Sequence, residues 1–124
     1  MTDREQQDVK TFRTLFANYL TDQAEWREEK AAEHPNDERN AGSARGLSAL
    51  ADYVASLPLD TFRLVRLAGL CPSIADALLF GEHAAGVIAR YHFDDPTEDG
   101  ALFLDRLADE MESDREAGAE AAAR

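Results

Sequence analysis

The sequence predicts an all-α fold, a compact bundle of about four main helices plus one short connecting helix. Apolar residues recur at spacings of three and four in four separate segments, which is the repeat of a helix with one buried face. Alternation of apolar and polar residues, the pattern of a half-buried strand, does not persist anywhere in the 124 residues. A chain of this length can build one core, so we expect a single helical domain over residues 1–112.

The first helix is expected to be long. Thr2 is a suitable N-cap, with Glu5 three residues later as a capping-box partner. The helix should run to about Glu33, because the residue before Pro35 disfavours helical geometry. About thirty residues make a helix of about 45 Å. Its apolar stripe consists of Val9, Phe12, Phe16, Tyr19, Leu20 and Trp26.

The second helix and the short connecting helix are bounded by proline and glycine. Asn36 or Asp37 can cap the second helix, which should end near Pro58. The connecting helix would then start from Asp60. We expect it to stop at Gly69 in a left-handed conformation, because glycine adopts that conformation without strain.

The last two main helices have their own start signals. Ser73, with Asp76 as its capping-box partner, starts a helix whose apolar residues continue past Gly81, where a bend is equally compatible with the pattern. Asp95 is the predicted cap of the final helix. Because acidic residues near a helix C-terminus oppose the macrodipole, the acidic and alanine-rich tail over 113–124 is expected to be frayed or disordered.

The charge of the chain is strongly negative and unevenly distributed. The formal net charge is −12, and residues 94–124 carry eleven acidic against three basic residues. Such a field repels nucleic acid and anionic membranes and attracts basic proteins, although solubility alone also accounts for it. The sequence has no apolar run long enough to span a membrane and no secretory signal. We therefore expect a cytoplasmic protein.

Residues 61–80, around "LAGLCPSIADALLFG", resemble the helix-turn-helix of bacterial repressors. The resemblance implies that residues 73–80 form a recognition helix, with Ser73 and Asp76 as the polar side chains that would face DNA. Contacts to bases and phosphates need basic or amide side chains, and the sequence has no basic residue between Arg66 and Arg90. The pattern therefore favours a tight corner between two helices over a site that reads DNA.

Catalytic chemistry is not indicated by any motif. Cys71 precedes a predicted helix N-terminus, where a thiol can be activated, but no family signature surrounds it. His34, His83 and His92 each lack the glutamate three residues earlier that is typical of carboxylate-bridged metal centres. Phosphate-binding loops and nucleophile elbows are also absent from the sequence. We therefore expect no catalytic residue, cofactor or metal ion.

The leading functional hypothesis is a non-catalytic helical module for protein–protein interaction or regulation. Tyr19 and Trp26 lie seven residues apart on the long first helix, and aromatic residues dominate interface hot spots. The partner would be another protein or a second copy in a homodimer, while a core position for Trp26 is the competing interpretation. Two alternatives remain: a transcription-related protein with a degenerate helix-turn-helix at 61–80, and an acidic mimic of DNA that binds a basic protein.

Overall fold

The computed structural model describes residues 1–71 and 80–123 of the chain. Five helices occupy most of these residues: α1 (Asp3–Glu33), α2 (Glu38–Ser56), α3 (Phe62–Leu70), α4 (Glu82–Ala89) and α5 (Gly100–Ala123). The described ranges contain no strand, so the all-α prediction is confirmed. None of these helices is both long enough and apolar enough to cross a membrane.

Helices α1 and α2 form an antiparallel hairpin whose N-termini are capped as the sequence predicts. The Thr2 hydroxyl accepts the Glu5 N–H at 3.2 Å, and the Asp37 carboxylate accepts the Arg39 N–H at 3.1 Å. At the far end of the hairpin, Arg13 of α1 donates to the Leu57 carbonyl just after α2, at 2.8 Å. The hairpin is thus capped at both helix N-termini, and a hydrogen bond joins its two helices near Leu57.

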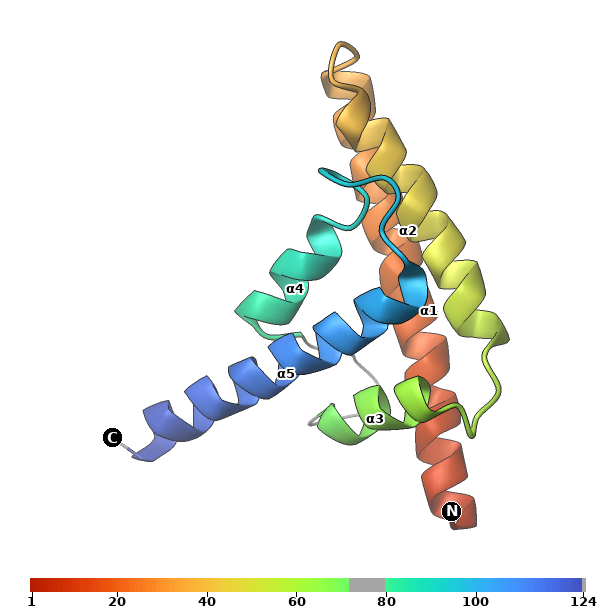
Figure 1. Cartoon of the computed structure of the whole chain (residues 1–124), viewed down its shortest axis with the longest axis vertical. Coiled ribbons are helices and arrows are strands. Elements are labelled where there is room, and N and C mark those ends of the chain that lie inside the picture. The colour runs from red at the N-terminus through yellow and green to blue at the C-terminus, as the bar shows by residue number, and fades with distance from the viewer. Residues whose placement is uncertain (72–79, 124) are drawn as a thin grey trace.

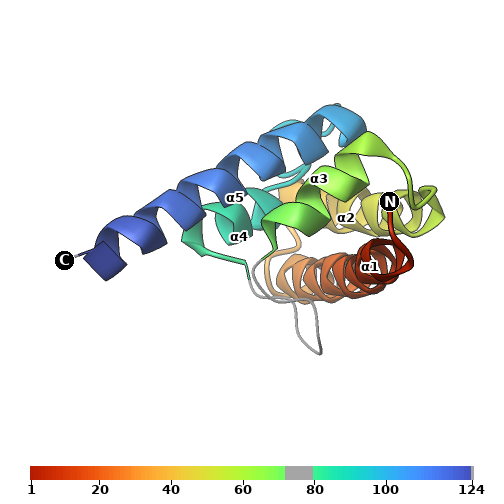
Figure 2. The same ribbon diagram turned by 90° about the horizontal axis from the view of Figure 1, so that it is seen from below.

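Helices α3 and α5 form a second layer that crosses the hairpin at a steep angle (Figure 1; Figure 2). They run side by side in the same direction, because Arg63 pairs with Asp105 at 3.1 Å and Arg66 pairs with Asp109 at 3.0 Å. The short α4 packs beside α5. The final turns of α5 project beyond the other helices (Figure 1).

The core lies between the two layers. Its largest fully buried side chains are Phe12, Phe16, Leu20, Leu47, Val54, Leu64, Leu67, Ile88, Phe103, Leu104 and Leu107. On α1 the buried stripe continues through Ala24 to Arg27 and not to Trp26, whose side chain is 41% exposed. The predicted apolar stripe was therefore wrong at its last position.

The short helix α3 differs from its prediction at both ends. Thr61 and not Asp60 holds the N-cap position, without a side-chain hydrogen bond. Gly69 is inside the helix, and no glycine of the described residues has a positive φ. Cys71 is extended, at φ −77° and ψ 122°, the conformation required of a residue before proline. The proline that follows in the sequence therefore explains the helix end better than the glycine does.

The fourth predicted helix does not continue through Gly81, and the final helix starts later than predicted. Gly81 is extended and α4 begins after it, so no single helix runs through Gly81; the predicted start at Ser73 lies outside the described residues. Helix α5 is capped by Asp99, which accepts the Leu102 N–H at 3.0 Å, whereas Asp95 bonds Thr97 in the preceding turn. A frayed or disordered tail over 113–124 is not confirmed, because α5 continues to Ala123.

Candidate functional site

Helix α4 is only eight residues long, and side chains from other helices cap both of its ends. At its N-terminus, Asp114 of α5 accepts the backbone N–H groups of His83 at 3.1 Å and Ala84 at 2.9 Å. Gly81 leaves room for this carboxylate, since a Cβ there would lie 2.4 Å from Asp114 Cγ. Asp114 therefore serves as the N-cap that α4 does not find in its own segment.

The Asp114 carboxylate also pairs with the His83 ring, at 2.7 Å between Oδ1 and Nδ1. Burial raises the pKa of Asp114, but hydrogen bonds from Ala84 and His83 outweigh it, and the net pKa lies below the ordinary value. The hydrogen bond from His83 to Asp114 and the charge of Asp114 raise the pKa of His83. Both shifts favour the ionised pair.

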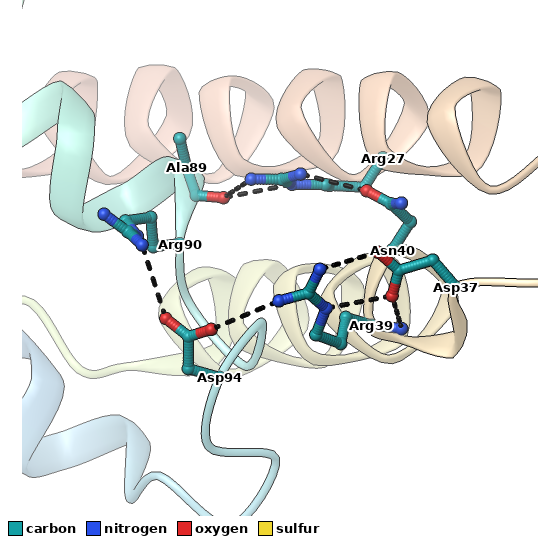
Figure 3. A network of polar contacts seen from close by, with 7 residues as sticks. All are labelled: Arg27, Asp37, Arg39, Asn40, Ala89, Arg90 and Asp94. Carbon is teal, nitrogen blue, oxygen red and sulfur yellow. Dashed lines mark hydrogen bonds and ion pairs between the residues drawn. The ribbon is translucent and has the colours of Figure 1, made fainter. Parts of the chain in front are cut away.

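Arg27 of α1 caps the other end of α4 (Figure 3). Its Nε and Nη2 both donate to the carbonyl of Ala89, the last residue of the helix, and its Nη1 donates to Asn40 Oδ1 at 3.0 Å. The residue is only 9% exposed. Burial, and then the charge of Arg90, lower its pKa below the ordinary value. The helix dipole places partial negative charge at this carbonyl, which offsets part of the cost of burying the cation.

The loop between α4 and α5 is fixed against the hairpin just beyond Arg27. Ser43 of α2, which is fully buried, donates its hydroxyl to the Tyr91 carbonyl at 2.7 Å. The Asp94 carboxylate lies between two guanidinium groups, at 3.9 Å from Arg39 and 3.6 Å from Arg90 (Figure 3). Each contact joins the loop to an element distant in sequence or to the end of α4, so the loop has a defined position.

His92 is the one non-glycine residue of the described ranges with a positive φ, at 57°. This conformation is uncommon outside glycine and marks a position held by its surroundings. The ring stacks on Tyr91 with centroids 4.1 Å apart, and its Nε2 lies 2.9 Å from the Glu98 carbonyl, to which it donates. Gly46 of α2 makes the space, because a Cβ there would lie 2.3 Å from His92 Nδ1.

An open hollow of about 400 Å³ lies where this loop meets α2 and the start of α5. We call it the α2/α5 hollow. It is lined by Gly46, Ala49, Leu50, Tyr53, Tyr91, His92, Asp99, Gly100 and Ala101. Burial and the negative charges of Glu98 and Asp99 raise the pKa of Tyr91 to about 12. The hollow is thus lined in part by aromatic residues and has the Asp99 carboxylate on its wall.

Large apolar side chains are exposed next to the hollow. Tyr53, on its wall, is 37% exposed, and Leu102, which follows Ala101 of the wall, is 63% exposed. Phe62 at the start of α3 is 75% exposed. Phe62 lies nearly opposite the buried Leu64 on α3, whereas Leu102 lies about 100° around α5 from the buried Phe103, and both side chains are exposed to solvent. We call Tyr53, Leu102 and the α2/α5 hollow the docking face.

The structure separates the residues that the sequence singled out for protein binding. Tyr19 is partly buried against the core, with its ring 4.8 Å from that of Phe80. Trp26 remains partly exposed, but the Arg27 guanidinium lies 4.6 Å from its ring centroid, so the indole covers the cap of α4. Ser73 and Asp76, the candidates for DNA contact, lie outside the described residues. Cys71 is buried.

The residues that sequence reasoning missed had only weak signals. Arg27 follows Ala24 by three residues on the buried stripe. Helical spacing therefore predicts that Arg27 is buried, whereas its charge favours a surface position. The glycines at 42 and 46 lie one turn apart on α2, and glycine leaves room for close approach of another segment. The position of His92 depends on contacts that no local pattern records.

Among the described residues, no group of three or more histidine, cysteine or carboxylate side chains is arranged to hold a metal ion. No family model, no curated protein and no solved structure shows significant similarity to the chain. The arrangement of the described residues is therefore the basis for the proposals that follow.

Proposed function

We propose that this chain is a non-catalytic helical module that binds a protein partner of net positive charge through the docking face. The observation that carries the proposal is the exposure of Leu102 and Tyr53 beside an aromatic hollow. Exposed apolar side chains next to a concave site are the usual anchors of protein interfaces. The indole of Trp26, by contrast, already packs over Arg27.

The docking face is built on a rigid support. Arg27 holds the end of α4 and Ser43 holds the loop after it, which forms one wall. The Arg63–Asp105 ion pair joins α5 to α3 one turn after Leu102. Preorganised surfaces lose little conformational entropy on binding. Binding to these few side chains therefore costs little entropy. The small apolar area is typical of a transient interface and not of an obligate one.

The charge of the chain favours a basic partner over a second copy. The net charge is −12, so two copies repel each other at low ionic strength, whereas a basic partner is attracted. Binding should weaken as salt is added. Dimerisation is the competing outcome, and size-exclusion chromatography with light scattering distinguishes it from the monomer that we expect in the absence of partner.

The test compares two exposed positions. Wild type, Leu102→Ser and Trp26→Ala are immobilised at equal amounts, after circular dichroism and thermal melting have verified folding, and each captures protein from a nuclease-treated native lysate. We expect Leu102→Ser to capture about tenfold less of a specific basic protein than wild type does. Trp26→Ala should capture as much of that protein as wild type. The reverse pattern would place the interface on α1 and would contradict the proposal.

A further inference from the structure

We propose that the α2/α5 hollow receives an arginine side chain from the basic partner. This inference rests on the proposed function and specifies the anchor that enters the docking face. Three features of the hollow support it: the exposed Tyr53 ring on its wall, the negative charge of Asp99 and an oxygen of the Asp99 carboxylate that is available as an acceptor.

The walls of the hollow supply three aromatic rings. Tyr53 comes from α2, and Tyr91 and His92 come from the loop before α5. A side-chain carbon at Gly100 would lie 3.8 Å from Tyr53 Cδ2, so the Tyr53 ring lies against the start of α5. The Tyr91 ring is buried and packs against both His92, at 4.1 Å, and Phe103, at 4.5 Å, so the partly exposed Tyr53 is the tyrosine ring open to a ligand. Tyrosine rings attract cations through their negative faces, and the planar guanidinium also stacks on them. The Tyr53 ring therefore favours a cation over an anion.

The electric field of the hollow has the sign that a cation requires. Glu98 and Asp99 both contribute to the raised pKa of Tyr91, and Asp99 lines the hollow. The N-terminus of α5 opposes them with the equivalent of about half a positive unit charge. A full carboxylate charge at Asp99 exceeds this, whereas the charge of Glu98 is offset by its ion pair with Arg106 at 2.6 Å. Asp99 is therefore the main source of negative charge at the hollow.

Asp99 also has an oxygen available for a hydrogen bond. Its Oδ1 accepts the Leu102 N–H, and its Oδ2 makes no hydrogen bond within the part of the chain that the structure describes. Carboxylate and guanidinium form short, charge-assisted hydrogen bonds. An arginine that stacks on the Tyr53 ring would donate to this oxygen, while the apolar part of its side chain packs against Leu50 of the wall.

The experiment uses two synthetic peptides that differ at one position. Both are short and otherwise neutral, with a central arginine flanked by leucines in one and citrulline, the uncharged isostere, in the other. Each is titrated into the full-length ¹⁵N-labelled protein. We expect saturable amide shifts centred on Gly46, His92 and Ala101, and binding about tenfold tighter for the arginine peptide. Equal affinity of the two peptides, or no binding at millimolar concentration, would overturn the inference.

Two matched variants distinguish an effect of the Asp99 carboxylate at the hollow from an effect of the net charge of the protein. Asp99→Asn removes the charge but keeps a residue that caps helices equally well. Asp22→Asn removes the same charge from an exposed position of α1 that forms no ion pair with the described residues. We expect Asp99→Asn to abolish the preference for arginine and Asp22→Asn to preserve it. Equal losses in both variants would show attraction by overall charge and would contradict the inference.

The outcome also distinguishes this inference from the proposed function. If Leu102→Ser prevents capture of the partner while arginine and citrulline peptides bind alike, the docking face stands and the arginine anchor is wrong. If Leu102→Ser leaves capture unchanged, the docking face itself is wrong, whatever the peptides show.

Discussion

The α1–α2 hairpin and helix α4 are stabilised in different ways. The N-termini of α1 and α2 are capped by Thr2 and Asp37, which directly precede them. Helix α4 has no side-chain cap from its own N-cap residue, Gly81, and depends on Asp114 and Arg27 from other helices. A helix of eight residues is marginal in isolation. We conclude that α4 and the loop after it form only when the rest of the fold is present.

This difference has a consequence for the docking face. The hairpin supplies one wall of the α2/α5 hollow, and the loop that follows α4 supplies another. The first wall is locally encoded, whereas the second depends on long-range bonds. Variants that release α4 should therefore damage the hollow while leaving the hairpin folded.

The largest expected effect is from Arg27→Ala. The variant leaves the Ala89 carbonyl and Asn40 Oδ1 without their donors and opens a space beneath Trp26. We expect the free energy of unfolding to fall by about 2–4 kcal/mol, measured by urea denaturation. Arg4→Ala, at an exposed arginine of the same helix, is the control and should change stability by less than about 0.5 kcal/mol. Equal effects of the two variants would contradict the capping role of Arg27.

A pair of glycine variants tests how closely the loop approaches α2. Gly46→Ala places a Cβ 2.3 Å from His92 Nδ1, whereas the nearest atom at Gly42 is the His92 carbonyl oxygen, at 3.8 Å. We expect Gly46→Ala to cost about 1–3 kcal/mol through overpacking. Gly42→Ala should be neutral or stabilising by up to about 1 kcal/mol, because alanine favours helix. Thermal melts of both variants would show whether the difference exists, and a stabilising Gly46→Ala would exclude the close contact.

The sequence predicts the elements that have local signals. The repeat of apolar residues and the caps at Thr2 and Asp37 placed α1 and α2 within a residue or two of their bounds. Prediction failed where tertiary contacts decide: Asp95 has the pattern of a cap, but α5 begins at Gly100 and is capped by Asp99, at the end of the loop that Ser43 fixes.

The candidate site was still less predictable than the fold. A tryptophan seven residues after Tyr19 on a long helix drew attention to Trp26, while the hollow consists of residues from α2 and from a segment far later in the sequence, between Tyr91 and Ala101. Leu102 stands beside Phe103 in an apolar run, and only the phase of α5 shows that Phe103 is buried and Leu102 is not. That phase depends on where the helix begins and which face meets α3.

The N-cap of α4 is expected to have a smaller effect than Arg27. Asp114→Ala removes the acceptor of two backbone N–H groups, and we expect a loss of about 1–2 kcal/mol. Asp114→Asn keeps the acceptor oxygen and should lose less than half of that. Urea denaturation of the two variants side by side tests the capping role, which would be wrong if alanine and asparagine were equivalent.

The pH dependence of stability provides the finest test of the same contact. The pKa of Asp114 is lowered from 3.8, so its contribution is present above pH 3.8 and is lost as pH falls through the lower folded value. The pKa of His83 is raised from 6.5, so its contribution is complete below pH 6.5 and is lost as pH rises through the higher folded value. The advantage of wild type over Asp114→Ala should therefore be largest between about pH 4 and 6.5.

Denaturation midpoints of wild type and Asp114→Ala from pH 3 to 9 would reveal this window. His83→Gln should remove the decline at high pH and keep the decline in acid. A difference between wild type and Asp114→Ala that is constant over the whole range would exclude the ionised pair as its cause.

The most direct test of the account is residue-resolved hydrogen exchange in wild type and Arg27→Ala under native conditions. The amides to compare are those of α4 from Ala85 to Ala89, which are helical in the structure, and those in the middle of α2. If long-range caps hold α4, Arg27→Ala should lower protection of α4 far more than that of α2, through local opening. An equal loss of protection in both helices would show that α4 unfolds only with the whole domain and would contradict the account.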